Sequence, residues 1–198
     1  MYIPKHFEIT DREEIYRFIK ANGFGQLISL VNGKLFSSHI PFLLSEDHCK
    51  LIGHISKQNP QWEDIENQVV MVTLEGPHDY ISPSWYVKPD SPPTWNYQAI
   101  HIYGRCSTIL DTEKLKSIVH SLTYKYESFL DDPWEPSYDE NMLHGIVGIE
   151  LKITEFQCKY KLSQNKTKED RILVSKTLDK LGSSDLAQAM RMNEFIIR

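Results

Sequence analysis

The dipeptide Asn32-Gly33 lies between two runs of alternating apolar and polar residues, 26–31 and 34–40. Both residues readily adopt the positive backbone angles of a type I′ turn, the two-residue connection that joins antiparallel strands. This pair constrains the fold more than any other feature, because it predicts a β-hairpin near the start of the chain. Together with the strands that follow, it predicts a mainly β protein.

Short runs of strand type recur after the hairpin. Residues 50–55 and 99–110 fit strands, and residues 146–156 alternate well enough for a final barrel strand. The near-continuous apolar run 69–74 predicts a strand that is buried on both faces. Six or more strands, joined mostly by tight connections with helices at the margins, predict a small closed or nearly closed barrel.

Helix start signals separate these strands. Thr10 and Glu13 form a capping-box pattern, and Asn59-Pro60 supplies an N-cap followed by proline at the first helical position. An apolar stripe at helical spacing marks a third helix. The helices expected are residues 11–22, residues 60–67, a helix that begins at Asp111 or Thr112, and a short turn at residues 141–144.

The character of the chain changes beyond Lys161. Residues 170–181 predict a helix with Gly182 as its C-cap, and Ser183 or Ser184 begins a second helix to about residue 195. We therefore expect two parts, residues 1–163 as a barrel domain and residues 164–198 as a helical extension. A DNA-reading helix-turn-helix is one interpretation of the pair, but an ordinary α-hairpin is favoured because the second helix offers few side chains suited to base edges.

Charge and composition narrow the partners. The net charge of −5 and pI near 5.9 give no chain-wide positive field for nucleic acid, so any DNA contact would be local. No apolar run approaches the length of a membrane-spanning helix, and the N-terminus lacks the pattern of a secretory signal. The three cysteines are odd in number and far apart, which favours the cytoplasm and buried, small-hydrophobe roles for Cys49, Cys106 and Cys158.

The segment 80–101 mixes aromatic residues with Ser, Thr, Asn and His, as the wall of a ligand pocket does. Its four prolines favour a structured loop between two strands. The competing interpretation is a proline-stiffened hairpin loop whose aromatic residues cap the core.

Two polar clusters are candidate anion sites. Ser56 and Lys57 lie at a strand end just before the predicted Pro60 helix, whose free amides would add a partial positive field. Residues 159–165 with Arg171 form a second cluster, which could complete a site in another subunit. A solvated strand-to-helix junction and a solvated linker are the competing interpretations. Glycine-rich phosphate loops and zinc motifs are absent from the sequence.

Several long strings in this order resemble the PaiB family of negative transcriptional regulators, which are grouped with FMN-binding split-barrel proteins. The strings are residues 38–42, 54–62, 76–86, 93–97 and 161–165. The resemblance implies a six-stranded FMN-binding split β-barrel that forms a homodimer, with a flavin site in the groove between subunits. The chain departs from the family pattern at Ser56-Lys57, where Ala-Arg is common, and at Cys158 and Tyr160, where Gly and Trp are usual.

The resemblance also implies a set of cofactor-binding residues. The phosphate side would comprise Ser38, His39, His54, Ser56 and Lys57. The ring side would comprise Tyr80, Ser82, Ser84, Trp85, Thr94, Trp95 and Asn96. His101, Lys161, Ser163 and Gln164 complete the set.

The function that the resemblance implies is a dimeric cytoplasmic regulator that lowers the expression of degradative-enzyme and sporulation genes. One alternative is a flavin-dependent oxidoreductase, for which His101 and Tyr97 are candidate proton-transfer groups. Another is a haem-handling protein with His39 or His101 as an axial ligand.

Overall fold

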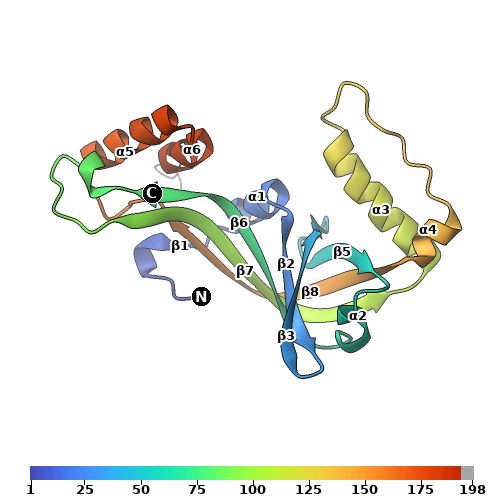
Figure 1. The fold of residues 1–198 in the computed structure, drawn as a ribbon. Helices are drawn as coiled ribbons and strands as arrows, with labels where there is room; N and C mark the ends of the chain where they lie inside the picture. The colour runs from blue at the N-terminus through green and yellow to red at the C-terminus, as the bar shows by residue number, and fades with distance from the viewer. Residues whose placement is uncertain (193–198) are drawn as a thin grey trace. The chain divides into compact units, whose positions relative to one another are not determined.

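A computed structural model describes residues 1–192 of the chain (Figure 1). Its strands are β1 (Glu8–Ile9), β2 (Phe24–Val31), β3 (Lys34–Pro41), β4 (Leu43–Leu44), β5 (Lys50–Ser56), β6 (Val69–Ile81), β7 (Thr94–Ile109) and β8 (Ile146–Lys161). Its helices are α1 (Arg12–Ala21), α2 (Gln61–Asp64), α3 (Thr112–Glu127), α4 (Glu140–His144), α5 (Lys168–Leu181) and α6 (Ser184–Met192), with short 3-10 turns η1 (Lys5–Phe7) and η2 (Pro83–Trp85).

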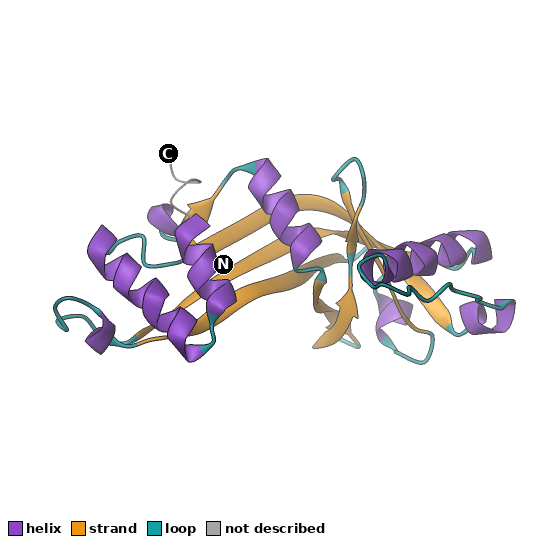
Figure 2. Cartoon of the chain, turned by 90° about the horizontal axis from the view of Figure 1, so that it is seen from above, coloured by secondary structure: helices purple, strands orange, loops and turns teal. Residues whose placement is uncertain are grey.

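The strands form one sheet in the order β3-β2-β6-β7-β8-β5-β4, and β1 pairs with β8. The pairs β1–β8, β2–β3, β2–β6, β4–β5 and β5–β8 are antiparallel, so the mainly antiparallel β prediction is confirmed. Figure 2 shows the long strands as continuous orange ribbons. The expected count of six strands is too low, because β1 and β4 are two residues long and leave no periodic signal. In the described part of the chain the sheet is open, since its order ends at β3 and β4.

The predicted hairpin is confirmed. Val31 pairs with Lys34 across the turn, and Asn32 and Gly33 have φ angles of 50° and 73°. Both angles lie in the left-handed region that a type I′ turn requires, which is why this pair selects the connection. In the register of β2 and β3, Ser38 lies opposite Leu27 and His39 lies opposite Gln26.

The region from residue 69 to residue 101 differs from its prediction in two ways. The run 69–74 is not buried on both faces, because Val69 is 67% exposed while the residues alternate inward and outward along β6. The expected loop 80–101 is also shorter than predicted, since β6 continues to Ile81 and β7 begins at Thr94. The four prolines therefore act only in the connection between those strands.

The residues form two compact units, and each is described by itself. Among the described residues, unit 1 consists of residues 1–15, 75–100 and 157–192, and unit 2 of residues 16–74 and 101–156. The long strands β6, β7 and β8 contribute residues to both. A boundary after residue 163 stays a prediction, because compactness in space does not show which part folds independently.

The expected helix 60–67 is shorter in the structure, and the helix before it has a different cap. Helix α2 spans only four residues, because Asn67 has a φ of 62° and its amide donates to the carbonyl of Cys106 instead of continuing the helix. At the start of α1 the amide of Glu13 donates to the Asp11 carboxylate at 2.9 Å. Asp11 therefore supplies the side-chain cap, and the predicted capping box of Thr10 and Glu13 is wrong.

The C-terminal helical pair is confirmed within unit 1. Thr167 caps α5 by accepting from the amide of Asp170, and Gly182 ends α5 with a φ of 91°. Helix α5 packs against α6 and η2, as Figure 1 shows. The predicted extension of the second helix to residue 195 lies partly outside the described residues.

Of the three cysteines, Cys106 and Cys158 are buried as predicted, but the prediction for Cys49 is wrong, because its side chain is exposed in the turn before β5. Among residues 1–192, no helix is both long enough and apolar enough to cross a membrane.

Candidate functional site

A polar pocket of about 200 Å³ lies in unit 1, where the start of β7 meets the end of β8. Side chains from three segments far apart in the sequence line it. They are Phe7, Tyr86, Ser91, Pro92, Thr94, Asn96, Lys161, Ser163, Asn165 and Lys166. Hydroxyl, amide and ammonium groups thus converge on a small volume, as they do in binding sites for polar ligands.

A buried polar contact forms the floor of this pocket. The Asn96 side chain is fully buried, and its amide nitrogen donates to the Ser163 hydroxyl at 2.9 Å and contacts the Met190 sulfur at 3.5 Å. Ser163 holds a φ of 63°, a left-handed conformation that is unusual for a residue with a Cβ atom. Asn96, on β7, therefore contacts both the segment after β8, through Ser163, and α6, through Met190.

Two lysines give the pocket a positive charge. The Lys161 ammonium donates to the Thr94 hydroxyl and, at 2.6 Å, to the carbonyl of Trp95. The Lys166 ammonium donates to Ser91 and lies 4.8 Å from the centre of the Tyr86 ring. Among the described residues neither ammonium forms an ion pair with a carboxylate. Burial, with the nearby charge of Lys159, lowers the pKa of Lys161.

Tyr86 contributes a buried polar group beside this pocket. Its side chain is buried, and within residues 1–192 its hydroxyl forms no hydrogen bond of ordinary geometry, although the Ser163 hydroxyl lies close to it. Burial raises the pKa of Tyr86 and outweighs the opposite effect of Ser163, so the phenol stays protonated. A buried hydroxyl with poor hydrogen bonding costs free energy.

A second hollow of about 380 Å³ adjoins this pocket and shares Tyr86, Ser91, Asn165 and Lys166 with it. Its wall is held by Asp170, whose carboxylate accepts from the amide of Val87 at 2.9 Å. That hydrogen bond and one from Thr167 hold the pKa of Asp170 below its ordinary value. The loop after η2 is thereby fastened to the first turn of α5.

Aromatic rings form an exposed surface on the same unit. Trp95 is 53% exposed and meets Tyr80 edge to face, with 6.3 Å between ring centroids. The ring of His78 lies 6.4 Å from that of Trp95. Aromatic faces that remain accessible provide a stacking surface for a flat heterocycle.

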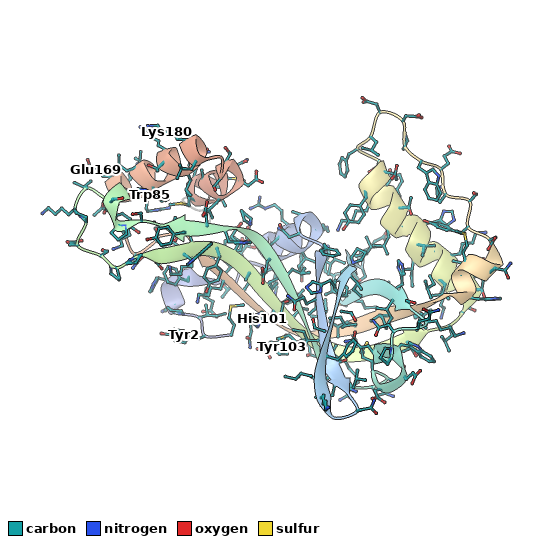
Figure 3. All side chains as sticks on the ribbon, viewed as in Figure 1. Tyr2, Trp85, His101, Tyr103, Glu169 and Lys180 are labelled. Carbon is teal, nitrogen blue, oxygen red and sulfur yellow. The ribbon has the colours of Figure 1, made fainter. Side chains whose placement is uncertain are left out.

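Three further predicted ring-side residues, Ser82, Ser84 and Trp85, lie at η2, which follows Tyr80 directly in the chain. Ser82 caps η2, and its hydroxyl contacts that of Ser84 at 2.8 Å. Trp85 lies on η2 beside the start of α5, where Figure 3 labels Glu169. Their role in ligand binding stays a prediction.

In unit 2 three of the five predicted phosphate-side residues, Ser38, Ser56 and Lys57, lie at or beside the turn after β5. The side-chain amide of Asn59 donates to the Ser38 hydroxyl at 2.7 Å, which joins β3 to this turn. His39 stacks on Phe24 with 6.4 Å between ring centroids, and the side chains of Ser56 and Lys57 are exposed. The structure therefore brings Ser38 close to the turn that carries Ser56 and Lys57.

The backbone amides of this turn have internal acceptors. Those of residues 57, 58, 59 and 61 donate to the carbonyls of Gly145 and Ser56 and to the side chains of Ser56 and Asn59. Since α2 has only one turn, the helix field that was expected to assist an anion is also small. Any anion at this turn would depend on side chains.

His54 lies on β5 opposite Gly148 of β8. Its Nδ1 atom is buried without a hydrogen-bond partner in the described part of the chain, and burial lowers the pKa of the imidazole. A neutral imidazole can act as donor or acceptor toward a ligand. His101, labelled in Figure 3, is a half-buried residue of β7 within unit 2.

The structure thus groups nine of the sixteen predicted residues into three sets. Thr94, Asn96, Lys161 and Ser163 share the polar pocket, Tyr80 and Trp95 share the aromatic surface, and Ser38, Ser56 and Lys57 share the turn in unit 2. Gln164 accepts from the amide of Leu162 at 2.7 Å, a bond that shapes the backbone beside Ser163. Cationic, hydroxyl and flat aromatic groups fit the phosphate and ring of a flavin mononucleotide.

Sequence reasoning missed part of this pocket. Ser91 and Lys166 are absent from the predicted set. Their side chains form a hydrogen bond, but 75 residues separate them in the sequence. Lys166 follows the string 161–165 directly, and this position was the signal that could have included it. No local pattern indicates that Ser91, in the loop between β6 and β7, is its partner.

Residues 1–155 match a protein family described as "Putative FMN-binding domain". The chain is 39% identical over 204 aligned residues to "Protease synthase and sporulation protein PAI 2" of Bacillus subtilis (strain 168). That match covers 99% of this chain and 96% of the relative.

Solved structures show the same fold at low identity. The flavocytochrome Anf3 from Azotobacter vinelandii superposes with a TM-score of 0.62 and 19% identity, covering 85% of this chain and 77% of that one. An FAD and heme binding protein from Mycobacterium smegmatis gives 0.60 and 13%, covering 82% and 77%. These likenesses extend to the fold alone.

Proposed function

The chain belongs to the family described as "Putative FMN-binding domain", and from this premise we propose that it is a flavin-binding regulator of the PaiB type. The observation that carries the proposal is the end-to-end match to "Protease synthase and sporulation protein PAI 2" at 39% identity. Because nearly the whole of both chains aligns, a role in protease synthesis and sporulation is the best-supported function.

Each of the three sets lies within a single unit and offers groups that flavin mononucleotide would use. Lys57, with Ser56 and Ser38, would hold the phosphate, since an ammonium and two hydroxyls can neutralise and hydrogen-bond its oxygens. The exposed faces of Trp95 and Tyr80 would stack on the ring. When bound, the flavin would supply a ring that accepts and releases electrons.

The oligomeric part of the proposal is a homodimer in the cytoplasm. The polar pocket near Lys161 would then face the flavin of the partner subunit, and its second lysine, Lys166, would strengthen the attraction for the anionic cofactor. The chain-wide charge of −5 argues that gene repression does not depend on a broad DNA-binding face. Repression would follow from ligand binding and a protein partner or from a local DNA contact.

Flavin binding can be tested by adding FMN to the purified protein and following the quenching of flavin fluorescence. We expect saturable binding that weakens at least about tenfold in Trp95→Ala, because one stacked aromatic face is lost. Trp134→Ala is the matched control. Both tryptophan side chains are 53% exposed, but Trp134 lies in unit 2, on the segment that follows α3, and belongs to none of the three sets. Absence of binding at saturating FMN would remove the flavin part of the proposal.

The same sample distinguishes the alternative functions. Prompt bleaching of bound flavin by NADH or NADPH without oxygen would favour an oxidoreductase, and a Soret band in protein purified from cells would favour haem handling. The regulatory part is tested in cells that lack the chain, by restoring wild-type protein or Trp95→Ala and measuring extracellular protease activity. We expect only the wild type to lower that activity.

A further inference from the structure

A groove in unit 2 is not used by the proposed flavin site. It runs between α3 and the segment after it, residues 128–139, which Figure 1 shows returning alongside the helix to α4. The groove encloses about 560 Å³ and is lined mainly by apolar surface. Its lining includes His120, Tyr124, Glu127, Trp134 and Glu135.

Specific contacts hold this groove open. The Glu127 carboxylate accepts from the backbone amide of Trp134 at 2.8 Å, and the hydroxyls of Thr123 and Tyr138 lie 2.6 Å apart. The Tyr138 ring meets His120 and Trp134 edge to face, at 5.4 and 5.8 Å between centroids. The segment is therefore fastened to α3 at both ends of the groove, and the groove is a preformed feature.

The aromatic residues around the groove remain exposed. Helix α3 buries its opposite face, with Leu115 and Val119, in a core cluster with Leu143. Tyr124 is 75% exposed, Phe129 86% and Trp134 53%. An apolar and aromatic surface of this kind beside a hollow is typical of an interaction site.

The segment that closes the groove carries charge of one sign. Residues 127–139 contain five acidic residues and neither lysine nor arginine; the acidic residues are Glu127, Asp131, Asp132, Glu135 and Asp139. The whole chain has a net charge of −5, so the remainder of the chain has a net charge of 0 (−5 minus −5). The lysines of α3, such as Lys116 and Lys125, are absent from the groove's lining.

We propose that this groove is a docking site for an extended, basic segment of a partner protein, with a lysine or arginine side chain entering between the aromatic walls. Aromatic faces attract cations, and the carboxylates at the rim would pair with further basic residues of the segment. Arginine would be preferred, because its planar group can stack on Trp134 and donate to Glu135 at once. Charge complementarity excludes an acidic partner and disfavours a purely apolar one.

Binding can be measured on the full-length protein with fluorescein-labelled hexa-arginine by fluorescence polarisation. We expect saturable binding at low salt, weaker binding to hexa-lysine and none to hexa-glutamate. Trp134→Ala and Tyr124→Ala should each weaken binding to hexa-arginine about tenfold or more, since each removes one cation–π contact. Glu135→Gln should weaken it less and reduce the salt dependence.

Two matched controls separate this site from general electrostatics and from the flavin site. Glu46→Gln removes the same charge from an exposed turn and should leave binding unchanged. Trp95→Ala should leave peptide binding unchanged while it weakens FMN binding, and Trp134→Ala should do the reverse. Failure of one proposal is thereby distinguished from failure of the other.

Two results would overturn the docking proposal. One is hexa-arginine binding that is equally strong in wild type, Trp134→Ala and Tyr124→Ala. The other is conversion of a dimer to monomers by these two variants in sedimentation, because a second copy of the chain would then cover the groove.

Discussion

Replacing Asn96 with alanine tests the buried hydrogen bonds between Asn96 and Ser163 beside the polar pocket. Asn96 is fully buried, donates to Ser163 at 2.9 Å and accepts from the same hydroxyl at 3.2 Å. The change leaves the buried Ser163 hydroxyl without this partner, which costs about 1–3 kcal/mol. It also leaves a small void against Met190, which adds about 1 kcal/mol.

The expected destabilisation is therefore about 2–4 kcal/mol. For a chain of 198 residues each kcal/mol lowers the melting temperature by about 2–4 °C, so Asn96→Ala should melt about 4–16 °C below the wild type. Differential scanning calorimetry measures this shift. Asn165→Ala, an exposed change in the neighbouring segment, should cost no more than about 0.5 kcal/mol.

A double-mutant cycle with Ser163→Ala isolates the hydrogen-bonded pair. Since both single changes remove the same contact, the double variant should be less destabilised than the sum of the two, by about 1 kcal/mol or more. A melting temperature of Asn96→Ala within 1 °C of the wild type would refute the reasoning. So would strict additivity of the two changes.

Three further predictions concern packing, titration and thiol reactivity. Gly104→Ala should destabilise the protein by about 2–4 kcal/mol in urea unfolding, because the added Cβ atom would lie 2.2 Å from the carbonyl oxygen of Lys152. The control Gly33→Ala should cost only about 1 kcal/mol, since Gly33 has open space around it and only its φ of 73° is unfavourable for alanine. Equal costs of the two changes would contradict this prediction. Because burial lowers the pKa of His54, the unfolded state binds a proton there more readily, so stability should be lost as the pH falls below 6.5. His54→Gln should lose less stability than the wild type between pH 7.5 and 5, and identical pH profiles would count against the assignment. Native protein should react rapidly with only one equivalent of a thiol reagent, at the exposed Cys49. Cys106 and Cys158 should not react, because both are buried and burial raises the pKa of each thiol to about 12. Rapid labelling that persists in Cys49→Ser would contradict this prediction.

Local patterns in the sequence predicted most individual elements. The Asn32-Gly33 turn and the Gly182 C-cap are confirmed because the conformation of each depends on residues next to it in the chain. The strings that resemble the PaiB family also indicated the family, which the match to residues 1–155 bears out. By contrast, the two-residue strand Leu43–Leu44 carries no pattern of its own and exists because Lys50–Ser56 lies beside it.

The sequence by itself determined most of the longer strands and helices and the turns between them, because backbone preference and side-chain periodicity act over a few residues. Only the tertiary structure decided that Lys166 meets Ser91 and that Asn96 meets Ser163. These contacts join positions more than 60 residues apart, and they depend on strand register and packing. Register and packing minimise the free energy of the whole chain, so no local pattern encodes them.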